Sequence, residues 1–81
     1  MSARVTLYTR QDCHLCETAR GVVAGVCADL GESFEEVDID IDATLRERFT
    51  DEVPVTFVDG RQHDFWRVDE TRLRTALAGP R

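Results

Sequence analysis

The chain has 81 residues, of which 42% are hydrophobic and 32% are charged. A length and composition of this kind predict one globular domain over residues 1–81 and exclude a disordered chain, which would carry fewer apolar residues. Ten basic and sixteen acidic residues give a formal net charge of −6, which disfavours binding to nucleic acid or to anionic membranes.

The first half of the chain predicts a strand, a helix and a second strand. Residues 4–9 are rich in β-branched and aromatic side chains, which is typical of a buried strand. Apolar residues then recur at helical spacing over residues 16–30, and Gly31 stands where a helix C-cap is expected. Over residues 34–41 apolar and acidic residues partly alternate, which predicts a second strand whose acidic positions face water.

Capping residues predict two further helices. Asp42 is suited to be the N-cap of a short helix that ends before Pro54. Asp69 is suited to be the N-cap of a last helix, which Gly79 and Pro80 terminate.

A β-hairpin is predicted between these two helices. Residues 55–58 and 62–66 flank Asp59-Gly60, a pair that favours a two-residue turn between antiparallel strands. The resulting order βαβαββα predicts an α/β fold in which a four-stranded mixed sheet is flanked by three helices. A right-handed crossover then places the residues that follow the first strand at the carboxyl edge of the sheet.

Cys13 and Cys16 lie at this edge, where the longest predicted helix begins. The unpaired amides and the positive dipole end of a helix N-terminus stabilise a thiolate, and in comparable motifs the thiol pKa falls from about 8.5 to about 3.5–7.5. Cys16 follows one turn later, within reach of Cys13, and is expected to be more buried. The spacing therefore predicts thiol-disulfide exchange, with Cys13 as the attacking thiol and Cys16 as the resolving thiol.

Four charged or titratable neighbours act on the Cys13 thiolate in opposite directions. Arg10 and a protonated His14 would favour the thiolate, whereas Asp12 and Glu17 would oppose it. The sign of the net effect stays open.

Metal binding and an inert cysteine pair are the alternatives to redox exchange. Four-coordinate zinc needs two further ligands, and beyond the His14 inside the motif the sequence offers only Cys27 and His63. Cys27 falls about three turns along the helix from Cys16, on its buried face, which favours a role in the core. We expect His63 on the surface of a strand.

The segments at residues 8–16 and 53–60, taken together, resemble the two signature segments of glutaredoxins and of the broader thioredoxin superfamily. The resemblance implies a thioredoxin-like, glutaredoxin-type fold over nearly the whole chain. In that superfamily the proline that matches Pro54 follows a cis peptide bond and faces the dithiol, and the backbone of the preceding residue pairs with the substrate. The resemblance therefore implies a substrate-binding role for Val53 and Pro54.

Two segments of the chain depart from well-known members of the superfamily. Glutaredoxins that use glutathione usually carry a Gly-Gly pair after the hairpin, where this chain has Asp69 and Glu70 in the segment 67–70, and two carboxylates there would repel an anionic ligand. Thioredoxins usually have Gly-Pro between the two cysteines, where this chain has His14 and Leu15.

The leading functional hypothesis is a dithiol-disulfide oxidoreductase that acts on disulfides of proteins or of small thiols. We expect Arg10, His14 and Leu15, which adjoin the cysteines, to contact the substrate together with Val53 and Pro54. No tightly bound cofactor is expected, and the electron donor would be a reductase or glutathione. We also expect a cytoplasmic monomer that binds neither nucleic acid nor membranes, since no apolar run approaches the roughly 20 residues that span a bilayer and no export signal is recognisable.

Three alternatives remain open. A glutathione-dependent glutaredoxin would need only Cys13, and a non-catalytic module would bind a metal ion or an iron-sulfur cluster through Cys13. A redox-sensitive binding protein would use Trp66 and the proline loop as a docking surface, although Trp66 is equally suited to packing within a strand.

Overall fold

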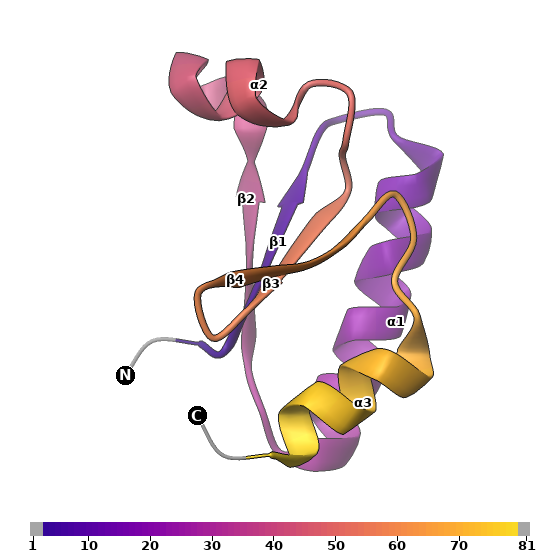
Figure 1. The fold of residues 1–81 in the computed structure, drawn as a ribbon. Coiled ribbons are helices and arrows are strands. Elements are labelled where there is room, and N and C mark those ends of the chain that lie inside the picture. Colours follow the sequence, from indigo (N-terminus) through magenta and orange to yellow (C-terminus); the bar gives the residue numbers. More distant parts are fainter. Residues whose placement is uncertain (1–2, 80–81) are drawn as a thin grey trace.

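The structure, a computed structural model, describes residues 3–79. Its strands and helices follow the predicted order (Figure 1). They are β1 (Val5–Thr9), α1 (His14–Leu30), β2 (Phe34–Asp38), the 3-10 turn η1 (Ile39–Ile41), α2 (Ala43–Phe49), β3 (Val55–Val58), β4 (Arg61–Phe65) and α3 (Glu70–Ala78).

The four strands form one mixed sheet in the order β2-β1-β3-β4. Strand β1 pairs in parallel with β2 and antiparallel with β3, and β3 pairs antiparallel with β4. The parallel pair is connected through α1, so the residues that follow β1 lie at the carboxyl edge of the sheet, at the upper end of the view in Figure 1. The sequence prediction of a mixed sheet with an antiparallel hairpin is confirmed.

Each face of the sheet carries its own hydrophobic cluster. On one face Val5 and Leu7 of β1 pack against the buried sides of α1 and α3, which Figure 1 shows together on one side of the sheet. The other face carries Ile39, Phe49 and Val55, with Tyr8 and Phe57 packed around them. The short helix α2 thus contributes its last residue to the core and leads directly into the loop before β3.

The predicted caps and turn are present. The Asp42 carboxylate accepts hydrogen bonds from two amides of α2, and the Asp69 carboxylate accepts one from an amide of α3. Gly31 ends α1 in the left-handed conformation with φ 68°, and Asp59 and Gly60 form the hairpin turn with φ 52° and 83°. The role predicted for Pro80 lies outside the described residues.

The second strand is shorter than predicted. Strand β2 ends at Asp38, because its register partner Thr9 is the last residue of β1 and no ladder continues beyond it. The Asp38 carboxylate instead accepts a hydrogen bond from the amide of Asp40 at 2.8 Å, which starts the turn η1. As a result Ile39 is fully buried, whereas Ile41 is 77% exposed and is not a strand residue.

The last strand also differs from the prediction at its ends. It runs from Arg61 to Phe65. Trp66 was expected within it but lies outside the strand, with a left-handed φ of 63°. The register of β3 with β4 shifts between Thr56 and Phe57, and the extra residue on β4 is His63. Because a bulge breaks the alternation of side chains, His63 does not lie on the surface as expected, and its side chain is only 12% exposed.

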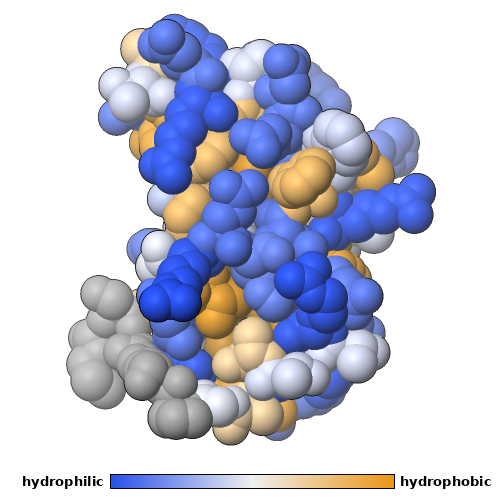
Figure 2. All heavy atoms as spheres, in the orientation of Figure 1, coloured by the Kyte–Doolittle hydropathy of each residue, from blue (hydrophilic) through white to orange (hydrophobic). Residues whose placement is uncertain are grey.

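Figure 2 shows a face dominated by hydrophilic residues and interrupted by separate apolar areas. Among residues 3–79, the structure contains no helix with the length and apolar character needed to span a membrane.

Candidate active site

Cys13 and Cys16 are joined by a disulfide bond at the amino end of α1, with their Cα atoms 5.2 Å apart. Cys13 is the N-cap of the helix and has extended backbone angles, so its sulfur turns back toward the first turn. There the amide of Cys16 donates a hydrogen bond to the Cys13 Sγ at 3.2 Å, while the Cys13 carbonyl accepts one from Glu17 at 3.1 Å. A first-turn amide is therefore already directed at the sulfur, which after reduction would stabilise a thiolate there.

The two cysteines differ in their access to solvent. Cys16 is fully buried, whereas Cys13 is partly exposed and lines a shallow hollow of about 270 Å³ with Asp12, His14 and Glu17. A molecule in solution can therefore reach the Cys13 sulfur but not the Cys16 sulfur. This asymmetry matches the attacking and resolving roles that the spacing predicts.

Val53 and Pro54 lie in the loop between α2 and β3, and the peptide bond that joins them is cis, as the resemblance implies. Pro54 is buried, and Val53 is partly buried against the second core cluster. Within residues 3–79 neither the amide nor the carbonyl of Val53 makes a hydrogen bond to another residue. The role in substrate binding that the resemblance implies for Val53 and Pro54 stays a prediction.

Trp66 connects this loop to the end of the β-hairpin. Its amide donates hydrogen bonds to the carbonyls of Pro54 at 2.7 Å and Glu52 at 3.2 Å, and its indole Nε1–H donates to the carbonyl of Asp51 at 2.7 Å. The sequence singled out Trp66 only as an aromatic residue of a strand or docking surface. Its left-handed backbone and its bonds to the proline loop carry no local sequence signal, because they arise from the packing of two segments that are distant in the chain.

A groove of about 320 Å³ runs along α1 beside the disulfide. Leu15, Thr18 and Val22 of α1 line one side, and Trp66 and Val68 line the other. Leu15 and Trp66, which border the groove on opposite sides, are 45% and 51% exposed. The groove brings the residue between the two cysteines together with the segment that holds the proline loop.

Residues 4–78 match the profile of the protein family described as "Glutaredoxin-like domain (DUF836)". The chain belongs to this glutaredoxin-like family. An uncharacterized protein of Mycobacterium tuberculosis is 38% identical over 80 residues, which cover 93% of this chain and 82% of that protein.

Solved structures agree with this assignment. Target protein XcR50 from X. campestris is 42% identical, with a TM-score of 0.76 over 94% of this chain and 99% of that chain. Thioredoxin from Fasciola hepatica is 21% identical, with a TM-score of 0.60 over 95% of this chain and 81% of that chain. At that identity the likeness shows the fold alone, and it confirms the thioredoxin-like fold predicted from the sequence.

The other predicted substrate-binding residues of this glutaredoxin-like protein occupy three different places. His14 lines the hollow of Cys13 with a fully exposed side chain, and its Nδ1 lies 3.8 Å from the Glu17 carboxylate. Leu15 lines the groove. Arg10 pairs with Asp40 of η1 at 3.3 Å and lines a separate polar hollow, so the structure does not bring its charge into the hollow of Cys13.

The third cysteine lies in the core, as predicted. Cys27 is 2% exposed and is not part of a disulfide. Burial, with a smaller contribution from the negative charge of Glu32, raises the pKa of the Cys27 thiol above its ordinary value. In this glutaredoxin-like protein Cys27 is therefore a protonated core residue at neutral pH. Within residues 3–79 no group of three or more His, Cys, Asp or Glu side chains is placed to hold a metal ion.

Proposed function

We propose that this glutaredoxin-like protein is a dithiol-disulfide oxidoreductase that reduces or exchanges disulfides of proteins or small thiols. The observation that carries the proposal is the asymmetric disulfide at the start of α1, in which Cys13 is reachable and Cys16 is fully buried. An inert structural disulfide has no need of this arrangement, because a bridge across three residues restricts the unfolded chain little.

The reaction begins with the reduced dithiol. The Cys13 thiolate attacks one sulfur of the substrate disulfide, the substrate S–S bond breaks, and the departing thiolate takes a proton from water. Cys16 then loses its proton and attacks the Cys13 sulfur. The mixed disulfide breaks, the second substrate thiol leaves, and the Cys13–Cys16 disulfide forms, so that two electrons have passed to the substrate.

The electron donor that fits the site best is a protein reductase rather than glutathione. Asp69 already occupies the N-cap of α3, where its carboxylate accepts a hydrogen bond from the Arg72 amide at 3.0 Å. Glu70 adds a second negative charge in the same turn. A glutathione carboxylate at this helix end would therefore meet an occupied amide and two like charges.

We further propose that the protein acts as a monomer in the reducing cytoplasm.

Three single substitutions test the roles of the cysteines. We expect Cys13→Ser to abolish reduction of a disulfide-bonded polypeptide such as insulin. Cys16→Ser should instead stop after the first step and accumulate a mixed disulfide with the substrate, which intact-mass spectrometry detects. Cys27→Ala is the matched control, because it removes a cysteine from the core and should retain exchange. Full activity of Cys13→Ser would overturn the proposal.

The reductant is tested by two coupled assays on the wild-type protein. One supplies NADPH with thioredoxin reductase, and the other supplies NADPH with glutathione and glutathione reductase. We expect faster turnover in the first assay. Turnover only in the second would assign the protein to the glutathione-dependent alternative, in which Cys13 remains the attacking thiol and glutathione can replace Cys16 as the resolving thiol.

A further inference from the structure

We infer that Trp66 is a positioning residue that holds the proline loop in the conformation that binds the substrate. The inference deepens the proposed function and rests on it. Trp66 reaches the loop through its amide and its indole N–H, which together bond the carbonyls of Asp51, Glu52 and Pro54.

These bonds leave out one residue of the loop, Val53. The carbonyls on both sides of it are tied to Trp66, whereas the Val53 amide and carbonyl have no hydrogen-bond partner among residues 3–79. An unpaired donor and acceptor on a fixed segment are what an extended substrate chain needs for main-chain pairing. Trp66 therefore fixes the frame around the two groups that the substrate would use.

The backbone of Trp66 shows that its place is not that of an ordinary strand residue. Its φ of 63° lies in the left-handed region, which glycine adopts without steric cost and residues with bulky side chains rarely adopt. The side chain is 51% exposed, so burial in the core does not account for it. What the tryptophan supplies and glycine could not is the bond from its indole to Asp51 and the apolar wall of the groove.

Trp66 also faces α1, the helix that begins at the dithiol. It lines the groove opposite Leu15, which stands between Cys13 and Cys16 in the chain. A single side chain thus borders both parts of the site, the redox motif and the proline loop. Because it makes no hydrogen bond to either cysteine, its loss should weaken substrate binding and leave the intrinsic reactivity of Cys13 unchanged.

Two variants of Trp66 separate its contributions. Trp66→Phe keeps an aromatic ring and removes the indole N–H, whereas Trp66→Gly removes the side chain and suits the left-handed backbone. The control is Phe65→Leu, which removes the exposed aromatic ring packed against the Trp66 ring, with the ring centroids 5.0 Å apart, and leaves the hydrogen bonds of Trp66 in place. For each protein we would measure KM and kcat with a disulfide-bonded polypeptide and the alkylation rate of Cys13 by iodoacetamide.

We expect Trp66→Phe to raise KM roughly five- to tenfold through loss of one hydrogen bond, and Trp66→Gly to raise it further. The value of kcat, the alkylation rate of Cys13 and the KM of Phe65→Leu should change less than about twofold. An unchanged KM in both Trp66 variants would overturn the inference. A rise in KM accompanied by parallel falls in the alkylation rate of Cys13 and in thermal stability would also overturn it, since that pattern belongs to a residue that only supports the fold.

A second measurement does not depend on activity. In Trp66→Phe the hydrogen-bonded amides of Glu52 and of residue 66 itself should exchange with deuterium faster than in the wild type, while the amides of α1 keep their rates. Unchanged deuterium exchange in this loop would refute the positioning role, even if the protein proved to have no thiol-disulfide exchange activity. Full disulfide-reducing activity of Cys13→Ser, by contrast, would refute the proposed function. The deuterium-exchange result for the loop would still hold.

Discussion

Glu36 of β2 accepts three side-chain hydrogen bonds beside helix α1. Its carboxylate accepts two bonds from Arg20 of α1, both at 2.6 Å, and one from the Thr9 hydroxyl at 2.9 Å. The bonds from Arg20 hold the pKa of Glu36 below its ordinary value of 4.5, against the opposing effect of burial, and Thr9 adds to the lowering. The pair ties α1 to β2 on the same face of the sheet as the first core cluster.

The lowered pKa makes part of the stability depend on pH. A carboxylate whose pKa is depressed in the folded state stabilises the fold at every pH above its ordinary pKa. This contribution is lost as the pH falls through the depressed pKa. We therefore expect Arg20→Gln to lower the free energy of unfolding at pH 7 by about 0.5 kcal/mol, a small figure because Arg20 is partly exposed and screened by solvent. Below pH 4.5 the difference from wild type should shrink and then vanish.

Urea unfolding of both proteins between pH 7 and acid pH measures this difference. Arg46→Gln serves as the control, because it removes an exposed arginine of α2 that forms no ion pair among residues 3–79. The difference in the free energy of unfolding between wild type and Arg20→Gln could instead stay constant down to full protonation of the carboxylates. That result would contradict the assignment of this pH dependence to Glu36.

The sequence predicted the properties of single residues best where they depend on near neighbours in the chain. Cys13 as the cap of a helix, Cys16 as the buried partner and Cys27 as a core residue are all found as predicted. Arg10 is different, because its partner Asp40 lies 30 residues away in a turn that the sequence assigned to a strand. Its orientation could not be derived without knowing where that strand ends.

At the scale of elements, α2 depends on its N-cap. This helix has only seven residues, and the Asp42 carboxylate accepts bonds from the amides of Thr44 at 2.7 Å and Leu45 at 3.3 Å. Seven residues are too few for a helix to persist alone, so the cap and the burial of Phe49 decide whether α2 forms. Since α2 leads into the proline loop, its stability bears on the site.

We expect Asp42→Ala to lower the free energy of unfolding by about 1 kcal/mol, the usual cost of losing such a cap. Asp42→Asn should stay close to the wild type, because the amide oxygen still accepts the bonds. Chemical denaturation in urea compares the three proteins. Equal losses in the alanine and asparagine variants would show that the negative charge, and not the capping bond, is what matters.

Helix boundaries were more predictable than strand boundaries for a physical reason. A helix begins and ends at caps such as Asp42, Asp69 and Gly31, whose preferences are local. A strand ends where its neighbour ends or where a bulge breaks the register, and both depend on another part of the chain. The early end of β2 at Asp38 and the displaced end of β4 at Phe65 follow from this difference.

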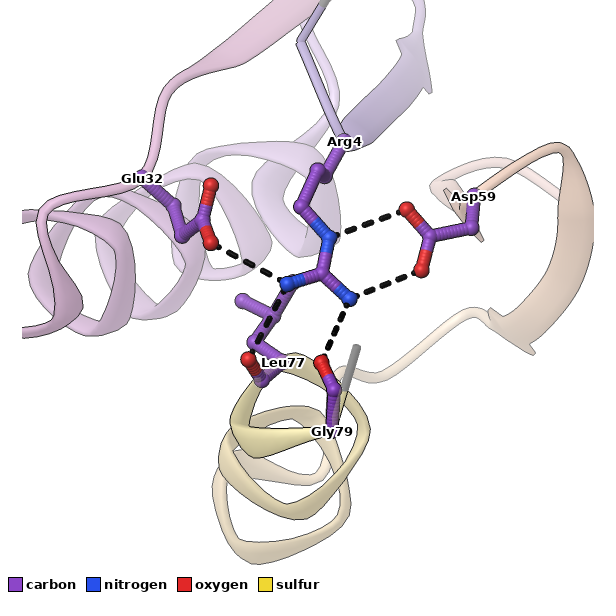
Figure 3. A network of polar contacts seen from close by, with 5 residues as sticks. All are labelled: Arg4, Glu32, Asp59, Leu77 and Gly79. Atoms are coloured by element: carbon purple, nitrogen blue, oxygen red, sulfur yellow. Dashed lines mark hydrogen bonds and ion pairs between the residues drawn. The ribbon is translucent and has the colours of Figure 1, made fainter. Parts of the chain in front are cut away.

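At the scale of the whole molecule, Arg4 ties together four parts of the chain (Figure 3). Its guanidinium donates two bonds to the Asp59 carboxylate, at 2.8 and 3.0 Å, and one to Glu32 at 3.1 Å. It also donates to the carbonyls of Leu77 and Gly79, at 3.1 and 3.0 Å, where α3 ends. The Asp59 bond raises the pKa of Arg4 further above its ordinary value, so this buried side chain stays charged.

We expect Arg4→Met to lower the melting temperature by about 5 °C or more, because two carboxylates and two carbonyls at the end of α3 would lose their partner together. The alkylation rate of Cys13 should not change, since Arg4 precedes β1 and Cys13 follows its far end. Scanning calorimetry and iodoacetamide kinetics measure the two effects. The control is Arg61→Met, which removes an exposed arginine at the start of β4, two residues after Asp59. Equal melting temperatures for the two variants would contradict this role of Arg4.

The amino-acid sequence by itself determined the order of strands and helices, the dithiol at the start of α1 and, through its resemblance to glutaredoxins, the cis bond at Pro54. These features rest on short-range patterns, because caps, turns and one-turn spacings involve residues a few positions apart. Only the tertiary structure decided where Trp66 and Arg4 bind, since both join segments that are far apart in the chain. Such contacts depend on strand register and on which loops meet at each end of the sheet, and these are properties of the packed molecule.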